Sequence, residues 1–156
     1  MLNPTDVIME LQEMRDEGFL SDALLRSAVR SIAGSDDRYN WAGAFLVKKG
    51  GEAIWLHNYI GAAAGYAEVQ VGEGIGGAAV AELGNRNVPD VGAVDGYTPC
   101  GPDIRSEMFV LIRAGDEVFG GIDLGSEAEA AFGDADEAAV QAISDKLAEQ
   151  IASERR

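Results

Sequence analysis

Two pairs of apolar segments, each joined by a short turn, constrain the fold of this chain more than any other feature. The first pair covers residues 41–48 and 52–60, the second covers residues 106–113 and 118–124, and each connecting turn contains glycine. Strands joined by so few residues must pair antiparallel, because a parallel pair needs a crossover of a dozen or more residues. The sequence therefore predicts a sheet assembled from two hairpins.

Segments with helical periodicity lie before the first hairpin and after the second. We expect one helix over residues 5–15, a second that begins with Ser21 as its N-cap and ends at Gly34, and a last one over residues 134–153. Strands grouped between helices are typical of the α+β class, here an antiparallel sheet with the N- and C-terminal helices packed on one face. The segments expected between the hairpins are a strand at 67–71, a glycine-rich turn at 72–77, a helix at 78–83 and an edge strand at 87–91 that contains Pro89.

Length and charge limit the class of protein. The 156 residues fit one domain, with helices in residues 1–34 and the rest of the fold in residues 36–151. The net charge of −15 argues against binding to nucleic acid and to anionic membrane surfaces. A single cysteine excludes an internal disulfide, and no signal peptide or membrane span is recognisable, so we expect an acidic cytoplasmic protein.

Cys100 is the one cysteine of the sequence, and its surroundings predict a loop. Residues 96–107 contain two prolines and two glycines and lead directly into a strand. A thiol on a loop at the end of a strand can meet a small molecule, whereas many free cysteines are buried and act as small apolar side chains. Exposure and pKa decide between a reactive and a structural cysteine, and both interpretations stay open.

Two acidic residues lie on the second hairpin. Glu107 opens its first strand, and Asp123 lies inside the apolar run 119–124. A carboxylate within a buried strand is costly unless it has a partner. These two carboxylates could face each other or the ammonium group of a ligand, and simple solvation at a strand end is the alternative for Glu107.

Three further features of the sequence are candidate sites. Trp41 and Phe45 share one face of their strand and either belong to the core or line a pocket. The glycine run at 72–77 lacks the Lys-Ser/Thr ending of a phosphate loop, which favours a turn that starts a helix. His57, the single histidine, is not enough for a zinc site or a triad, and we expect it at the surface or at a sheet edge.

Together these segments resemble the free methionine-(R)-sulfoxide reductases, which have a GAF fold. The resemblance covers residues 36–151 and implies a GAF-like antiparallel sheet. The motifs that carry the resemblance follow one another in the family's order and spacing. They are residues 40–46, 71–79 and 88–91, Cys100 with Arg105-Ser106-Glu107, and residues 121–126.

The resemblance implies that the protein reduces free methionine sulfoxide without a metal or an organic cofactor. Cys100 would be the nucleophile and Glu107 the proton donor, and Arg105 could help to balance the acidic charge. Trp41, Phe45, Glu107 and Asp123 would bind the substrate. A thioredoxin or a small thiol would regenerate Cys100 from its sulfenic acid, and we expect a homodimer.

Four positions depart from the family pattern. Two further cysteines of many members fall on Tyr66 and Gly76, an acidic residue falls on Gly125, and the aspartate after the catalytic cysteine is Gly101. These departures leave two alternatives open. The chain could be a non-catalytic GAF module that binds a small ligand or acts in signalling, or a structural dimer formed through its terminal helices.

Overall fold

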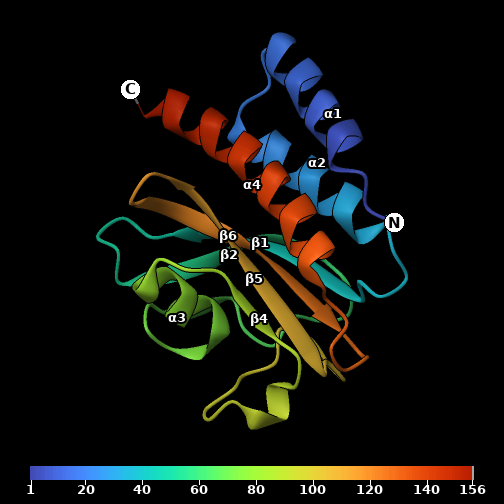
Figure 1. The fold of residues 1–156 in the computed structure, drawn as a ribbon. Helices are drawn as coiled ribbons and strands as arrows, with labels where there is room; N and C mark the ends of the chain where they lie inside the picture. The colour runs from blue at the N-terminus through green and yellow to red at the C-terminus, as the bar shows by residue number, and fades with distance from the viewer. Residues whose placement is uncertain (156) are drawn as a thin grey trace.

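The computed structural model describes residues 1–155 and contains one six-stranded sheet in which every neighbouring pair is antiparallel (Figure 1). The strand order is β3-β2-β1-β6-β5-β4, so the two predicted hairpins meet at the centre of the sheet through β1 and β6. This confirms the antiparallel α+β prediction. The strands are β1 (Trp41–Val47), β2 (Ala53–Ile60), β3 (Glu68–Gln70), β4 (Arg86–Val88), β5 (Ser106–Ala114) and β6 (Glu117–Ser126).

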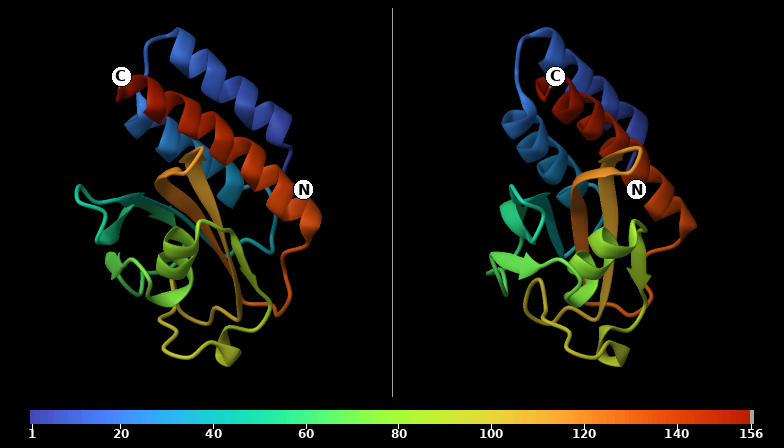
Figure 2. Two further views of the ribbon diagram at one scale, coloured as in Figure 1. Left: turned by 60° about the vertical axis from the view of Figure 1, so that its left-hand side comes forward. Right: turned by 90° about the vertical axis from the view of Figure 1, so that its left-hand side faces the viewer.

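The N- and C-terminal helices lie on one face of the sheet, as predicted (Figures 1 and 2). Helices α2 (Ser21–Ala33) and α4 (Asp134–Glu154) pack on the strands, and α1 (Pro4–Asp16) packs on those two helices. Helix α3 (Gly74–Glu82) lies on the opposite face, and the short 3₁₀ turn η1 (Val91–Ala93) follows β4. None of the helices within residues 1–155 combines the length and the apolar character that crossing a membrane requires.

Two local predictions are wrong. Ser21 is the first residue of α2 and not its N-cap, and its hydroxyl donates to Glu154 Oε1 over 2.8 Å. Helix α3 begins at Gly74, inside the segment that we expected to be a turn. His57 lies on β2 beyond the residues that pair with β3, and its side chain is only 6% exposed and bonds to Asp22 of α2 over 2.8 Å.

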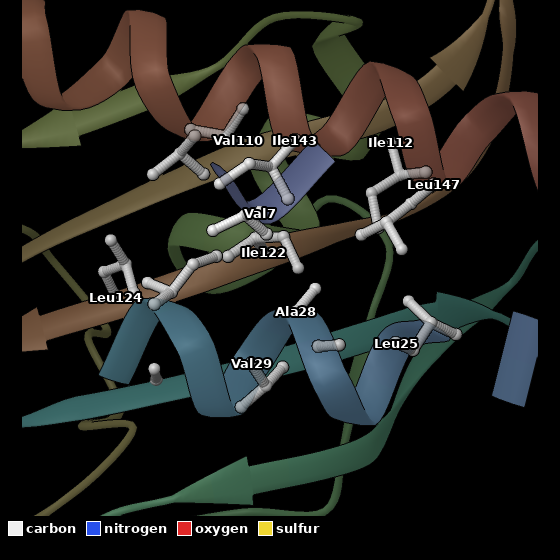
Figure 3. Packing of buried hydrophobic residues seen from close by; sticks show 14 of the residues in the cluster. Val7, Leu25, Ala28, Val29, Val110, Ile112, Ile122, Leu124, Ile143 and Leu147 are labelled. Carbon is white, nitrogen blue, oxygen red and sulfur yellow. The ribbon is translucent and has the colours of Figure 1, made fainter. Parts of the chain in front are cut away.

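A large apolar core fills the space between the sheet and the helices, and we call it the helix-side core (Figure 3). The strands reach it with alternate residues, as the two-residue period of a strand dictates, and a bulge at residue 119 of β6 turns Phe119 to the same side. Its members from β5 and β6 are Met108, Val110, Ile112, Phe119, Ile122 and Leu124, and the helices add residues such as Leu25, Ala28, Val29, Ile143 and Leu147.

The opposite face of the sheet carries a second, smaller buried cluster, the loop-side core. Helix α3 and the loop between β4 and β5 cover it. Part of this cover is held by a backbone hydrogen bond of 2.9 Å from Gly65 N–H to the Cys100 carbonyl. The loop-side core contains Trp41, Phe45, Ile54, Ile75, Ala79, Val80, Val91, Cys100, Ile104, Phe109 and Leu111.

Candidate functional site

Cys100, Glu107 and Asp123 come together on the loop-side face. Glu107 of β5 pairs with Gly125 of β6, and Asp123 lies two residues earlier on β6, so the two carboxyl groups are diagonal neighbours on one face. The β4–β5 loop then places the Cys100 sulfur beside them. Sγ of Cys100 and one oxygen of each carboxyl group lie within 4.8 Å of one another.

All three side chains are buried, and three of the four carboxyl oxygens lack a donor among residues 1–155. Cys100, Glu107 and Asp123 are 1%, 0% and 1% exposed. The Tyr97 hydroxyl donates to Glu107 Oε1 over 2.9 Å. Glu107 Oε2 and both oxygens of Asp123 have no hydrogen-bond partner among residues 1–155. Unpartnered carboxylates are expensive to bury, so this site must retain a proton or receive donors from a ligand.

The carboxyl pair retains protons more strongly than ordinary carboxyl groups. Burial raises the pKa of Asp123 well above its usual value, and the neighbouring charge of Glu107 raises it further. Burial also raises the pKa of Glu107, although the hydrogen bond from Tyr97 opposes this rise. The pair therefore retains a proton to a higher pH than two separate carboxyl groups would.

The same surroundings keep Cys100 as a thiol when the site is empty of cations. Burial raises the pKa of the Cys100 thiol, and the charges of Asp123 and Glu107 raise it further. Burial likewise raises the pKa of Tyr66 and of Tyr97. Arg105 does not supply the balancing charge, because its guanidinium pairs with Glu129 over 2.6 Å at the exposed surface. A cation that enters the site would favour the thiolate.

Aromatic side chains border this group. Trp41 stacks on Tyr59 with ring centroids 5.5 Å apart, and its buried Nε1 has no hydrogen-bond partner among the described residues. It also lies against the Cys100 loop, since a Cβ at Gly101 would approach Trp41 Cδ1 to 2.7 Å. Phe45 lies 5.7 Å from the Tyr66 ring, measured between centroids. The structure thus brings Trp41 to the sulfur-bearing loop and places Phe45 with Tyr66.

Gly125, where the resembled family has an acidic residue, lies directly under Cys100. A Cβ at this position would be 2.8 Å from both Cys100 Sγ and Ile104 Cδ1. That separation is shorter than real carbon contacts, so a side chain at 125 requires the loop to move. The loop can therefore pack this closely over the sulfur because residue 125 is a glycine and not an acidic residue.

Two tyrosines that the sequence did not single out as functional also lie at this site. Tyr97 bonds to Glu107, and Tyr66 contacts Phe45. In the sequence, both are aromatic residues within loop-like segments. That pattern is too common to identify a functional residue. Tyr66 also lines a small pocket of about 60 Å³ formed with the start of α3 and with Gly96 and Thr98 of the Cys100 loop.

A surface hollow of about 440 Å³ lies elsewhere, between the end of α3, β5 and α4. It is lined by Asn85, Arg113, Gln141 and Asp145 among others, and it includes none of the predicted site residues. Cys100, Glu107 and Asp123 are therefore separate from this hollow.

Solved structures share this arrangement of sheet, helices and loops. The chain is similar to the type II free methionine-R-sulfoxide reductase of Thermoplasma acidophilum, with 27% identity, a TM-score of 0.78, and coverage of 85% of this chain and 93% of that one. It is also similar to the free methionine-R-sulfoxide reductase of Neisseria meningitidis in complex with its substrate, with 22% identity, a TM-score of 0.86, and coverage of 97% and 90%. The chain has a GAF fold. A third similar structure, the GAF domain of the Acinetobacter phosphoenolpyruvate-protein phosphotransferase, has 16% identity and a TM-score of 0.81 over 99% of this chain and 97% of that one.

No protein-family model and no curated protein matches the chain. The GAF fold is therefore established by structure. The solved structures that share it include reductases of free methionine-R-sulfoxide and a GAF domain that is part of a phosphotransferase, so the fold alone does not select the activity.

Proposed function

We propose that this GAF-fold protein reduces free methionine-(R)-sulfoxide with Cys100 as the nucleophile and an external thiol as the final reductant. One observation carries this proposal. The single sulfur nucleophile lies within 4.8 Å of two buried carboxyl groups, three of whose oxygens lack a partner among the described residues. The ammonium group of a free amino acid would supply the missing donors and the missing positive charge. A methionine inside a protein chain has no such ammonium group.

Binding of the substrate would change the protonation of the site. An ammonium group beside Glu107 and Asp123 lowers their pKa, so that the pair gives up its retained proton more readily. The same positive charge lowers the pKa of the Cys100 thiol and raises the fraction of reactive thiolate. The apolar end of the substrate would lie against Trp41 and Phe45. The thiol would then become reactive when the substrate is present.

The reaction transfers one oxygen atom. The Cys100 thiolate attacks the sulfoxide sulfur, and a carboxyl group of the pair, in our proposal Glu107, donates a proton to the sulfoxide oxygen. The oxygen passes to Cys100, which is oxidised by two electrons to a sulfenic acid, and methionine leaves as the reduced thioether. One external thiol then forms a mixed disulfide and releases water. A second thiol displaces the first as a disulfide and restores Cys100.

A turnover assay tests the proposal. With free methionine-(R)-sulfoxide and dithiothreitol, the wild-type protein should release methionine, and Cys100→Ser should reduce the rate to background. The (S)-sulfoxide and an N-acetylated sulfoxide, which lacks the ammonium group, are the matched substrate controls. Circular dichroism shows whether the serine variant is folded, and Cys100→Ala provides a second variant. Turnover by Cys100→Ser, or equal turnover of the N-acetylated substrate, would contradict the proposal.

A non-catalytic GAF module remains the second candidate, because the sulfur is buried and the pKa of its thiol is raised. In that case the wild-type protein would bind a small ammonium ligand without turnover, and Cys100→Ser would bind it equally well in a thermal-shift titration. The homodimer and the cytoplasmic location stay predictions, and analytical ultracentrifugation tests the first.

A further inference from the structure

We infer that the thiol that regenerates Cys100 is a small aminothiol, which places its ammonium group on Glu107 and Asp123 after methionine has left. This inference rests on the proposed function and names the chemical class of its second substrate. It selects a small thiol over a protein dithiol such as a thioredoxin.

The oxidised sulfur cannot be resolved within the chain. The sequence contains one cysteine, so the sulfenic acid at Cys100 has no second thiol of its own to form a disulfide. Tyr66 and Gly76 occupy the positions where the resembled family has further cysteines. A thiol from outside must therefore reach Cys100 itself.

The cover over Cys100 favours a small thiol. Cys100 is 1% exposed, its carbonyl accepts the Gly65 hydrogen bond, and Gly125 lies against both its sulfur and the Ile104 side chain. A mixed disulfide requires the two sulfur atoms to approach to about 2.05 Å. A thiol on a short chain can enter by the route that free methionine sulfoxide takes. A thiol fixed on the surface of a folded protein would need a much wider opening of the same loop.

The charge of the site selects among small thiols. The unpartnered oxygens of Glu107 and Asp123 remain in place after methionine leaves, and they again need a cationic donor. An anionic thiol would meet these carboxyl groups and a protein of net charge −15. An ammonium group close to a thiol also lowers the pKa of that thiol, which raises its thiolate fraction near neutral pH.

The chemistry balances with two aminothiol molecules for each methionine sulfoxide. The first attacks the Cys100 sulfenic acid, forms an S–S bond and expels the oxygen as water, with the proton supplied by the carboxyl pair. The second attacks the outer sulfur of this mixed disulfide. Cys100 leaves as a thiol, reduced by two electrons, and the two aminothiols leave as one oxidised disulfide.

Thiol–disulfide exchange tests this binding mode without any sulfoxide. The reduced protein is mixed with cystamine, with 2-hydroxyethyl disulfide or with 3,3′-dithiodipropionate, and the mixed disulfide is followed by intact mass, which reports Cys100 alone because it is the single cysteine. The rate for each reagent is divided by its rate with the chain unfolded in denaturant, which removes intrinsic reactivity. We expect cystamine to exceed the neutral reagent by at least about tenfold and the anionic reagent to be slowest.

Two variants locate the preference. Asp123→Asn should bring the cystamine rate close to that of the neutral reagent. Asp103→Asn, which removes the same charge from an exposed position on the Cys100 loop, should leave the preference unchanged.

Equal normalised rates for the three reagents, or the same loss in both variants, would overturn the inference. So would a thioredoxin that supports sulfoxide turnover at lower concentration than cysteamine does. A cystamine preference without sulfoxide turnover would instead refute the proposed reductase activity and leave the ammonium site standing.

Discussion

The two faces of the sheet differ in composition and in cover, although the same strands form both. Met108, Val110 and Ile112 of β5 point into the helix-side core, whereas Glu107 and Phe109 point to the loop side. Regular helices seal the first face, and loops with α3 seal the second. A strand with a two-residue period can thus supply stability on one face and reactive groups on the other. The stability that the helix-side core contributes offsets the free-energy cost of the polar groups that are buried on the loop side.

Asp136, which is half-buried, and Asp123, which is buried, illustrate this difference. Asp136 at the start of α4 accepts hydrogen bonds from Arg38, 2.7 Å away, and from Tyr39. Burial alone would raise the pKa of Asp136, yet these bonds lower it below its usual value. Asp123 has no cation beside it, and its pKa is raised. A carboxyl group that lacks partners in the folded protein is suited to a ligand, and one that has them is structural.

The largest effect should come from the helix-side core. Ile122→Ala removes a fully buried side chain from β6 and leaves a cavity under the helices. We expect the free energy of unfolding to fall by about 2–5 kcal/mol. Urea denaturation followed by circular dichroism measures this loss. A loss below 1 kcal/mol would show that this face does not dominate stability.

A smaller effect should come from the cover on the loop side. A Cβ at Gly65 would lie 2.0 Å from the Pro99 carbonyl oxygen, so Gly65→Ala must push the Cys100 loop away. We expect a loss of about 1–3 kcal/mol in the free energy of unfolding. Labelling of Cys100 by a thiol reagent should become at least about tenfold faster, because local opening exposes the sulfur.

Gly84→Ala is the matched control for this variant, since nothing lies within 4 Å of a Cβ at Gly84. It should change neither the stability nor the labelling rate. Unchanged labelling in Gly65→Ala would mean that the loop does not limit access to Cys100.

The smallest effect, and one of opposite sign, should come from Asp123→Asn. Because the pKa of Asp123 is raised on folding, the folded protein binds more protons than the unfolded chain at any pH between the unfolded pKa, about 3.9, and the folded pKa. Wild-type stability therefore falls as pH rises through this window, by at most about 1.4 kcal/mol per pH unit for one proton. The asparagine variant lacks this dependence.

Denaturation at several pH values measures the difference between the two proteins. We expect Asp123→Asn to become more stable relative to the wild type by about 1 kcal/mol between pH 5 and pH 7. Glu137→Gln on α4 removes an acidic residue outside the site and serves as the control. A difference that shrinks as pH rises would contradict the raised pKa of Asp123.

The sequence predicted the elements well where the pattern is local. Both hairpins and the three terminal helices appear within about two residues of their expected bounds, because periodicity and turn residues report on neighbours along the chain. Helix α3 was placed too late, since its first residues include glycines with poor helix propensity. Gly77 shows the physical reason, because a Cβ there would lie 2.3 Å from the Gln70 carbonyl oxygen. Close packing on the β3 segment required glycine inside the helix.

The amino-acid sequence by itself determined the order of the elements, the acidic character of the protein, the single cysteine, and the two acidic residues on one hairpin. Only the tertiary structure decided that Cys100, Glu107 and Asp123 meet, that they are buried, and that their pKa values are raised. The reason is physical. Burial and pKa depend on groups that lie far apart in the sequence, such as Trp41 and Gly65 beside Cys100, and local patterns carry no record of those contacts.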